Sequence, residues 1–341
     1  MLADPARYYK GGKPDLQLFD KKLYEVNPDD KVAIARAAAE EVLGKDERII
    51  SVDSSYSDGE GSSYRLISNG FEGESKSTWF SVSASVSIKG EGEARPQDYW
   101  YDSALFYDKL TKTGIGAKAL ERVLRKLGQK KAKSGKYTMV VDPMNVGNLL
   151  SPMLSALYGS ALQQKNSFLM DKLDTKVASD LFTLRDEPHA IGANGSRYFD
   201  NEGVATEPRT VFDKGVLKTY FIDTYNGKKM DIAPTISAPS RLILTLGDKD
   251  LNGLVADIKQ GILVTGFNGG NSNSSTGDFS YGIEGFLIED GKLTQPVNEM
   301  NVTGNMVTLW NSLVAVGNDP QPNRSWQIPS LVFEGVDFSG L

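Results

Sequence analysis

The chain contains a single histidine, His189, and no cysteine. Ser-His-Asp catalysis would therefore require His189, and a metal site with several histidine ligands cannot form. The lack of cysteine excludes disulfides, thiolate zinc sites and a cysteine nucleophile. Asp200 and Glu202 could act with His189 as an acid and a base, and a hydrolase built on these three residues stays an alternative. Because turn chemistry explains both carboxylates, we expect His189 to lie in a loop with a structural or solvent-facing role.

A second candidate is the stretch 266–277, which is rich in Gly, Asn and Ser. Apolar runs flank it, and Asp290-Gly291 further along predicts a hairpin. The stretch lacks the strand-then-helix setting and the lysine of a phosphate-binding loop, so nucleotide binding is not expected. A polar loop of this length cannot form its own core, so we expect it at the surface or along a cleft. The candidate cleft or peptide-binding residues are Gly269, Gly270, Asn271, Asp278 and Tyr281.

The composition is typical of a soluble globular protein. Of the 341 residues, 40% are hydrophobic and 24% are charged, and the net charge is -6 at pH 7. A mildly acidic chain argues against direct binding to nucleic acid, which requires a basic surface. No window approaches the ~18 apolar residues of a membrane span, and the first residues show no signal-peptide pattern. We therefore expect a cytoplasmic protein with no membrane partner.

Patterning in residues 1–132 predicts a small domain of mixed α/β structure. A polar, non-periodic segment at 1–28 is expected to form a peripheral arm. Helices are predicted at 31–43 and 115–127, each with an apolar stripe and a glycine at its end. Asn69-Gly70 predicts a hairpin between two of the strands. The predicted strands are 48–52, 62–68 and 78–88. The basic link at 129–135 is the expected boundary with a second domain, 133–341.

The second domain is expected to be larger and rich in β-structure. Asp142-Pro143, after a buried strand at 137–141, predicts the start of a helix that runs to about residue 163 and is kinked at Pro152. A short helix is predicted at 251–260. Further strands are predicted at 182–184, 210–212, 216–221, 242–246, 261–265, 280–289, 292–297, 302–307 and 330–334. Many short strands with few helices favour an α+β fold whose second domain is an antiparallel sheet or β-barrel.

Several motifs distributed along the chain belong together. They are Asp98-Tyr99-Trp100-Tyr101, Asp200-Asn201-Glu202-Gly203-Val204-Ala205-Thr206, Gly215-Val216-Leu217, Thr276-Gly277-Asp278-Phe279-Ser280-Tyr281-Gly282, Gly304-Asn305-Met306, Val314-Ala315-Val316-Gly317-Asn318-Asp319 and Pro329-Ser330-Leu331-Val332-Phe333-Glu334-Gly335-Val336. This set resembles the TldD/PmbA family, also called modulators of DNA gyrase, in its PmbA (TldE) branch. The likeness covers nearly the whole chain from about Leu2.

The resemblance implies a heteromeric protease that acts on unfolded or peptide substrates. One branch of the family carries a zinc-binding His-Glu-x-x-x-His helix and a distal cysteine ligand, and the PmbA branch is the partner subunit that lacks them. Aligned on Gly159, the equivalent positions in this chain hold Ser155, Ala156 and Ser160. Serine and alanine offer zinc no ligand at neutral pH, so we expect a degenerate metal site and no cofactor, with zinc only in a catalytic partner.

Family members also carry an α/β segment before the point at which this sequence begins, so the domain at 1–132 is expected to be incomplete relative to the family. The favoured hypothesis is a non-catalytic partner subunit of a TldD/PmbA-type metalloprotease complex, paired with a TldD-like subunit and acting on unfolded peptides. The alternatives are a stand-alone peptide-binding or scaffold protein that forms a homodimer, and the hydrolase centred on His189. In a binding role, the glycine-rich loop would shape a cleft or a partner interface and pair with an extended peptide as an added strand.

Overall fold

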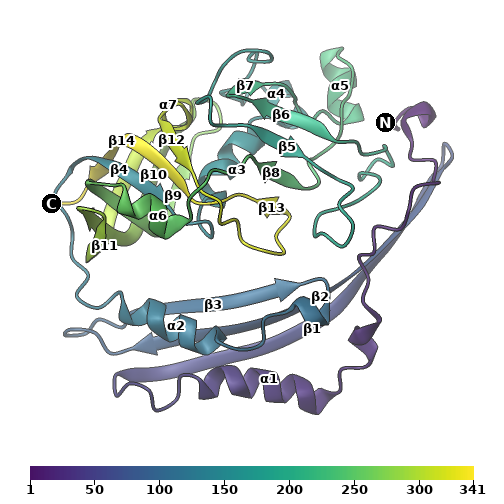
Figure 1. The fold of residues 1–341 in the computed structure, drawn as a ribbon. Helices are drawn as coiled ribbons and strands as arrows, with labels where there is room; N and C mark the ends of the chain where they lie inside the picture. The colour runs from purple at the N-terminus through teal and green to yellow at the C-terminus, as the bar shows by residue number, and fades with distance from the viewer.

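The computed structural model describes all 341 residues and places them in two bodies, one above the other in Figure 1. The lower body is a three-stranded antiparallel sheet in the order β1-β2-β3. Its elements are α1 (Pro28–Glu40), β1 (Ile49–Ile67), β2 (Phe71–Ile88), β3 (Gln97–Ala104) and α2 (Ile115–Leu124). Alternate residues of β2 from Phe80 to Ile88 are buried with residues of α1 and α2, because a strand presents every second side chain to the same face.

β1 and β2 extend beyond β3 as a long two-stranded hairpin that reaches the second body (Figure 1). At the tip, Phe71 is 1% exposed, and its ring centroid lies 5.2 Å from that of Tyr8 and 5.1 Å from that of Phe199. Gly203 allows this contact, since a Cβ atom there would lie 2.6 Å from the Phe71 ring. The two bodies are thus joined at one end by the linker after α2 and at the other end by this hairpin.

The second body contains a closed barrel. Its strands follow the order β11-β10-β9-β4-β14, and pairing of β11 with β14 closes the ring. All neighbours are antiparallel except β4 and β9, which are parallel. The barrel strands are β4 (Gly135–Val141), β9 (Gln260–Ser272), β10 (Asp278–Glu289), β11 (Lys292–Asn305) and β14 (Leu331–Ser339), with β12 (Leu313–Val316) added beside β14. The predicted α+β class and the barrel alternative are therefore confirmed.

A second, five-stranded sheet lies beside the barrel, in the order β13-β8-β5-β6-β7. Its strands are β5 (Leu184–Asp186), β6 (Arg209–Asp213), β7 (Val216–Leu217), β8 (Leu242–Leu244) and β13 (Trp326–Gln327). The helices of this body are α3 (Gly147–Ser155), α4 (Gly159–Gln163), α5 (Thr224–Met230), α6 (Leu251–Ala256) and α7 (Met306–Asn311). None of the helices in the chain is long and apolar enough to cross a membrane.

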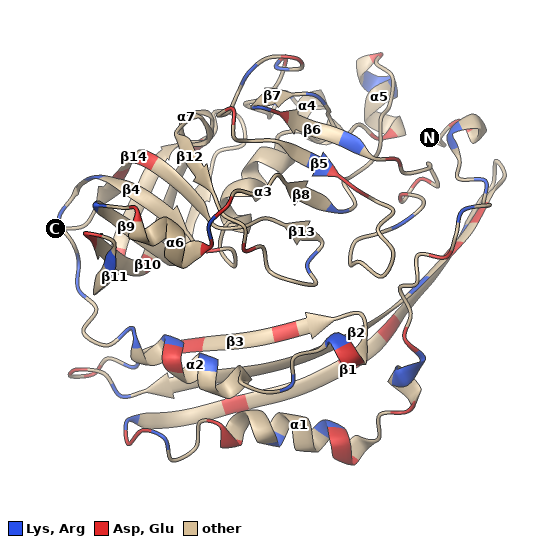
Figure 2. Cartoon of the chain, in the orientation of Figure 1, with Lys and Arg blue, Asp and Glu red and all other residues tan.

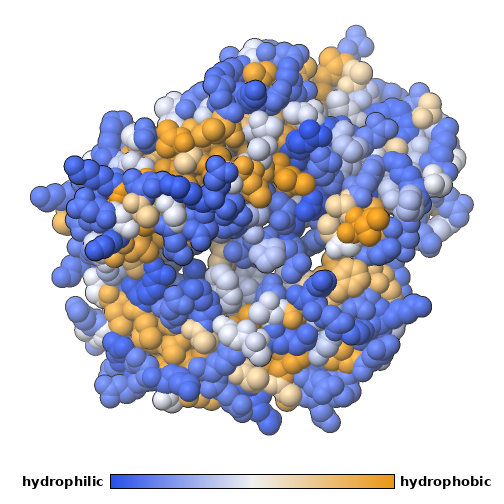
Figure 3. Space-filling model, in the orientation of Figure 1, coloured by the Kyte–Doolittle hydropathy of each residue, from blue (hydrophilic) through white to orange (hydrophobic).

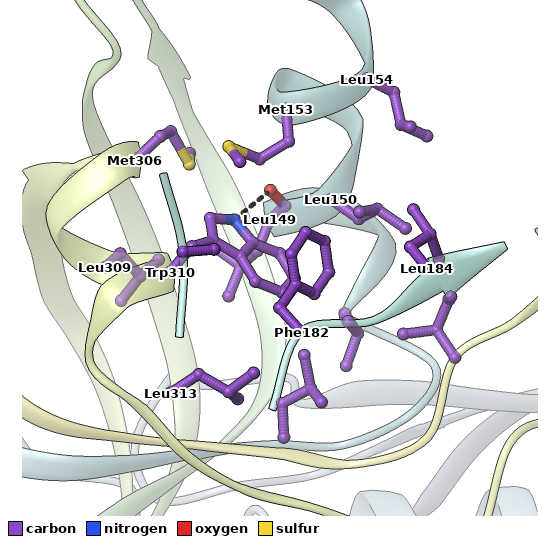
Figure 4. Close-up of a cluster of buried hydrophobic side chains, with 14 of the residues drawn as sticks. Leu149, Leu150, Met153, Leu154, Phe182, Leu184, Met306, Leu309, Trp310 and Leu313 are labelled. Atoms are coloured by element: carbon purple, nitrogen blue, oxygen red, sulfur yellow. Dashed lines mark hydrogen bonds between the residues drawn. The ribbon is translucent and has the colours of Figure 1, made fainter. Parts of the chain in front are cut away.

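Trp310 on α7 is central to the main core, where it packs with side chains of α3 and of the segment before β5 (Figure 4). Its ring centroid lies 4.4 Å from that of Phe182 and 5.6 Å from that of Phe333 on β14. The buried indole Nε1–H donates to the carbonyl oxygen of Leu149 at 3.3 Å, so its one polar group is satisfied. These contacts fix the apolar face of α3 against the barrel.

The N-terminal arm includes short 3-10 turns at Pro5–Arg7 and Lys21–Tyr24 and lies along both bodies. Near its start, the Tyr9 N–H donates to the Gly203 carbonyl at 3.0 Å. Ala3, Tyr8 and Phe71 belong to the core cluster of the second body rather than to that of the first. The division into domains 1–132 and 133–341 stays a prediction, and these three residues cross it.

Three local predictions need correction. The strands expected at 48–52 and 62–68 are one continuous strand, β1. The stretch 266–272, expected as loop, belongs to β9, and only residues 273–277 connect it to β10. The kinked helix expected at 144–163 is two separate helices, α3 and α4, and Pro152 lies inside α3 without ending it.

Candidate functional site

A cleft opens between the two bodies, and we call it the central cleft. It consists of adjoining hollows of about 610 and 360 Å³ that share Arg122, Met144 and Thr265 in their walls. α2 and β3 form its lower wall, and the segment directly after β4, the start of α6 and β9 form its upper wall. Figure 3 shows the surface hollowed between the two bodies on this face. Ligand sites are often found in such hollows between packed units.

α2 supplies the basic side of the cleft. Its apolar residues, including Ile115, Ala119 and Val123, are buried against the sheet. The spacing of the remaining residues then places Lys118, Arg122 and Arg125 together on the face toward the cleft. The carboxylate of Glu41 accepts hydrogen bonds from the first backbone N–H groups of α2, the shortest being 2.6 Å from Gly114, and this fixes the start of the helix.

A buried ion network crosses from the lower body to the barrel. The Lys126 ammonium lies 3.2 Å from Asp98 on β3 and 2.7 Å from Glu284 on β10. Arg122 Nε lies 3.3 Å from the same Asp98 carboxylate, while its two terminal nitrogens donate to no other protein group. The Lys126 and Asp98 side chains are only 9% and 6% exposed, so solvent screens this network weakly.

Asp142 lies in the upper wall directly after β4 and is 4% exposed. Its carboxylate accepts hydrogen bonds from the backbone N–H of Asn145 at 3.0 Å and from the Asn145 amide at 2.6 Å. Asn145 also donates to the carbonyl oxygen of Thr265 on β9 at 2.9 Å, which fixes the turn from Asp142 to Asn145 against the barrel. Burial raises the pKa of Asp142 to about 6, and the hydrogen bonds from Asn145 and the charge of Arg122 oppose the rise. The predicted helix start at Asp142 is wrong, because the helix begins at Gly147.

Two family models match the chain. The PmbA/TldA metallopeptidase central domain matches residues 21–127, and the PmbA/TldA metallopeptidase C-terminal domain matches residues 134–340. The chain belongs to the PmbA/TldD metallopeptidase family. The resemblance inferred from the motifs is therefore confirmed.

Relatives and solved structures of this family resemble the chain over almost its whole length. A Haemophilus influenzae protein named metalloprotease PmbA homolog is 30% identical over 332 residues, which cover 96% of this chain and 73% of the relative. A crystal structure from Bacteroides thetaiotaomicron, described as a candidate modulator of DNA gyrase, is 73% identical with a TM-score of 0.99, covering 100% of this chain and 78% of that one. TldE of Thermococcus kodakarensis, at 22% identity, has a TM-score of 0.81 over 100% of this chain and 79% of its own, which shows a shared fold.

The positions that the PmbA/TldD resemblance assigns to the metal helix are not on one helix. Ser155 is the last residue of α3, and Ser160 lies in α4 beyond an intervening turn. Both serines are exposed, whereas Ala156 between them is fully buried. Two neutral hydroxyls and a methyl group do not fit zinc, and nowhere in the chain do three His, Cys, Asp or Glu side chains converge on a point that could hold a metal ion.

The predicted peptide-binding residues lie on paired barrel strands rather than in a loop. Gly269, Gly270 and Asn271 are exposed near the end of β9, and Tyr281 on β10 lies opposite Gly270 in the ladder. Asp278 accepts hydrogen bonds from Asn305 at 3.0 Å and Thr276 at 2.7 Å. The walls of the central cleft contain the preceding part of the same strand, Gly266 to Asn268, but none of these five residues. Peptide binding by the five residues stays a prediction.

The three residues of the hydrolase alternative have separate partners. His189 lies after β5, and its Nε2 is 3.1 Å from the Thr206 hydroxyl and 3.5 Å from the Lys13 ammonium. Asp200 is 2% exposed and accepts hydrogen bonds from three backbone N–H groups, at Glu202, Val204 and Ser237. The Glu202 carboxylate accepts from the N–H and hydroxyl of Thr224 at the start of α5. No hydrogen bond joins any two of the three side chains, and the bonds of both carboxylates stabilise local structure.

The cleft residues Asp142 and Arg122 were not among the predicted site residues. The only signal for Asp142 was its position directly after a buried strand, which also suits a helix cap. Arg122 is one of several charged residues on the polar face of an amphipathic helix, and sequence alone does not distinguish it from solvated neighbours. The cleft of this PmbA/TldD protein therefore offers hydrogen-bond donors, charges of both signs and a carboxyl whose pKa is raised by burial, which suit binding of a peptide.

Proposed function

We propose that the chain is the non-catalytic partner subunit of a PmbA/TldD-type metalloprotease complex that processes unfolded peptides. The observation that carries the proposal is the set of side chains at the metal-helix positions, Ser155, Ala156 and Ser160, in a family described as metallopeptidases. Without zinc ligands a chain activates no metal-bound water, so the chemistry would belong to a TldD-like subunit that keeps them. We place this complex in the cytoplasm, in line with the lack of cysteine.

In this proposal the central cleft receives the peptide. β3 is an edge strand of its sheet and contributes Gln97, Asp98, Tyr99 and Trp100 to the walls of the cleft. An edge strand can pair with an extended chain through backbone hydrogen bonds, which makes binding largely independent of sequence. Arg122 and Asp142 would then contact charged groups of the peptide. Strand addition at the glycine-rich segment stays a separate prediction, and β3 is a further surface on which an extended peptide could pair.

The test measures peptidase activity on an unfolded, fluorogenic protein such as labelled casein. Three samples are compared: this chain alone, a TldD-like subunit that retains both histidines, and an equimolar mixture. We expect cleavage that a chelator abolishes and zinc restores, and we expect it only in the mixture or strongly enhanced there. The matched control is the same mixture with the metal-helix glutamate of the TldD-like subunit replaced by glutamine. Cleavage by this chain alone, persisting in the presence of the chelator, would contradict the proposal and favour a hydrolase.

A variant can show whether the cleft binds the peptide or instead serves association with the TldD-like subunit. Arg122→Gln removes one positive charge from the cleft, and Lys259→Gln removes one from an exposed site outside it. We expect Arg122→Gln to weaken peptide binding several-fold, as measured by fluorescence anisotropy, while both variants associate with the TldD-like subunit like the parent chain.

A further inference from the structure

Basic side chains surround a pocket between the N-terminal arm and the start of β6, far from the linker. The pocket has a volume of about 510 Å³ and shares no lining residue with the central cleft. Its charged lining residues are Arg7, Lys10, Lys13, Glu207 and Arg209. Figure 2 shows positively charged residues along the arm and on β6. We call this pocket the arm pocket. Its lining contains four cations and one carboxylate, although the net charge of the chain is -6.

None of the four cations forms a salt bridge, whereas the buried Lys126 ammonium lies between the carboxylates of Asp98 and Glu284. Arg7 donates to the carbonyl oxygen of Thr235, and the Lys13 ammonium lies near His189 Nε2 and 5.4 Å from the centre of the Tyr198 ring. The Arg209 guanidinium makes no hydrogen bond to the protein, and its Nε is buried without a partner. A buried, unpartnered guanidinium nitrogen is costly, which indicates that another group satisfies it.

The neighbouring carboxylates form no salt bridge with the basic side chains of the pocket, although Asp186, Glu207 and Asp200 partly offset the charge of Arg209. Asp186 and Asp200 are near enough to Arg209 to affect its pKa, but both are engaged by backbone N–H groups, and both are 2% exposed. Glu207 is exposed at the edge. Arg7 repels Arg209. Burial together with Lys13 lowers the pKa of His189, which favours its neutral form, so this histidine adds no further positive charge.

We propose that the arm pocket binds an oxyanion, the carboxylate or phosphate group of a small ligand. The half-buried guanidinium groups of Arg7 and Arg209 would hold its oxygens, because the planar arginine fork matches both groups. Lys10 and Lys13, which are exposed at the mouth, attract the anion from solution. The proposal concerns a site separate from the central cleft and does not depend on the proposed protease role.

Isothermal titration calorimetry on the full chain tests this proposal with three probes: inorganic phosphate, pyrophosphate and citrate, at ionic strength held constant with sodium chloride. We expect saturable binding of at least one probe and an affinity that falls with added salt. Tighter binding of pyrophosphate than of citrate identifies a phosphate site, and the reverse order identifies a carboxylate site.

Variants then assign the binding to the pocket. We expect Arg209→Gln to weaken binding of the tightest probe by about tenfold or more. Arg209→Lys should retain part of the affinity, because it keeps the charge but loses the planar guanidinium group. Lys10→Gln, at an exposed position that does not threaten folding, should weaken binding by about threefold. Lys259→Gln, which removes an equal charge outside the pocket, should have no effect. No binding of any probe at millimolar concentration, or equal binding by Arg209→Gln, Lys10→Gln and Lys259→Gln, overturns the proposal.

Discussion

Asp142 combines deep burial with a position in the wall of the central cleft. Burial raises its pKa from 3.8 to about 6, so the folded protein binds this proton more tightly than the unfolded chain does. This tighter proton binding adds to the free energy of unfolding. The contribution is fully present below about pH 4 and is lost as the pH rises through 6. Above pH 6 the protein retains a buried charge that is only partly compensated by Asn145 and Arg122.

Asp142→Asn is expected to remove this pH dependence. The amide oxygen of the new residue can still accept the hydrogen bonds from Asn145, and no charge is buried at any pH. A shift of roughly two pKa units corresponds to about 3 kcal/mol, so the variant should gain up to that much relative to the parent chain between pH 4 and pH 7. Urea unfolding of both proteins across this range measures the difference. A difference in stability that does not change with pH would show that Asp142 titrates normally.

At the scale of elements, the tip of the β1–β2 hairpin contacts the second body and the arm through the Phe71 ring and through hydrogen bonds of Asn69 with Tyr8 and Ala3. Phe71 lies among Tyr8, Phe199 and Gly203, whereas the stem between this tip and β3 is mostly exposed. A two-stranded ribbon is only marginally stable by itself, so the anchor at its tip holds the outer part in place.

Phe71→Ala should release the tip. Loss of a buried phenylalanine side chain typically costs about 3–5 kcal/mol, and here the loss is concentrated in the hairpin and the arm. We expect faster amide hydrogen exchange over residues 59–75, together with a lower unfolding midpoint. Tyr64→Ala, in the same hairpin at a side chain that is 63% exposed, is the matched control and should change stability by less than about 0.5 kcal/mol. Equal exchange in the two variants would argue that Phe71 does not anchor the hairpin.

Elements with clear periodicity were predicted from the sequence. The alternation in β2, the capped helix α1 and the turns at Asn69-Gly70 and Asp290-Gly291 all form as expected. The segment 266–272 was wrongly predicted as loop because its Gly, Asn and Ser composition is typical of loops. At Gly270 a Cβ atom would lie 2.1 Å from the carbonyl oxygen of Ser280, so glycine is required there for close approach within a paired ladder.

Other features depend on partners distant in the chain. The middle of β1, from Asp53 to Gly61, has no apolar alternation, and it forms a strand because β2 pairs with it residue by residue. The central cleft draws Arg122, Asp142 and Glu284 from elements in both bodies, which no local pattern could bring together. The resemblance named the metal-helix positions. It did not predict that α3 ends at Ser155, so that Ser160 lies in a separate helix.

For the molecule as a whole, Lys126 ties the two bodies together beside the linker. Its ammonium lies between Asp98 of the lower sheet and Glu284 of the barrel, and it also donates to the Gln97 carbonyl at 3.0 Å. Removing one member of a buried ionic group leaves the others unpaired, which is more costly than loss of the contact itself.

A double-mutant cycle with Lys126→Met and Glu284→Gln measures this connection. We expect Lys126→Met to destabilise the protein by about 3–5 kcal/mol and the pair to show a coupling energy of about 1–3 kcal/mol in urea unfolding. The exposed pair Lys136–Asp337, whose side chains are 68% and 59% exposed, is the comparison and should couple by less than 1 kcal/mol. Coupling as small as that of the exposed pair would mean that Lys126 does not tie the bodies together.

The closure of the barrel has a consequence for the time course of synthesis. β4 ends at Val141, and its antiparallel neighbour β14 begins at Leu331, 190 residues later. At translation rates of about 5–20 residues per second, synthesis of the residues between β4 and β14 takes about 10–40 seconds. During that interval one edge of β4, whose last three residues are buried in the finished protein, has no partner, and unpaired strand edges favour aggregation. Chaperone binding to the nascent chain is therefore expected to matter most between the emergence of these two strands from the ribosome.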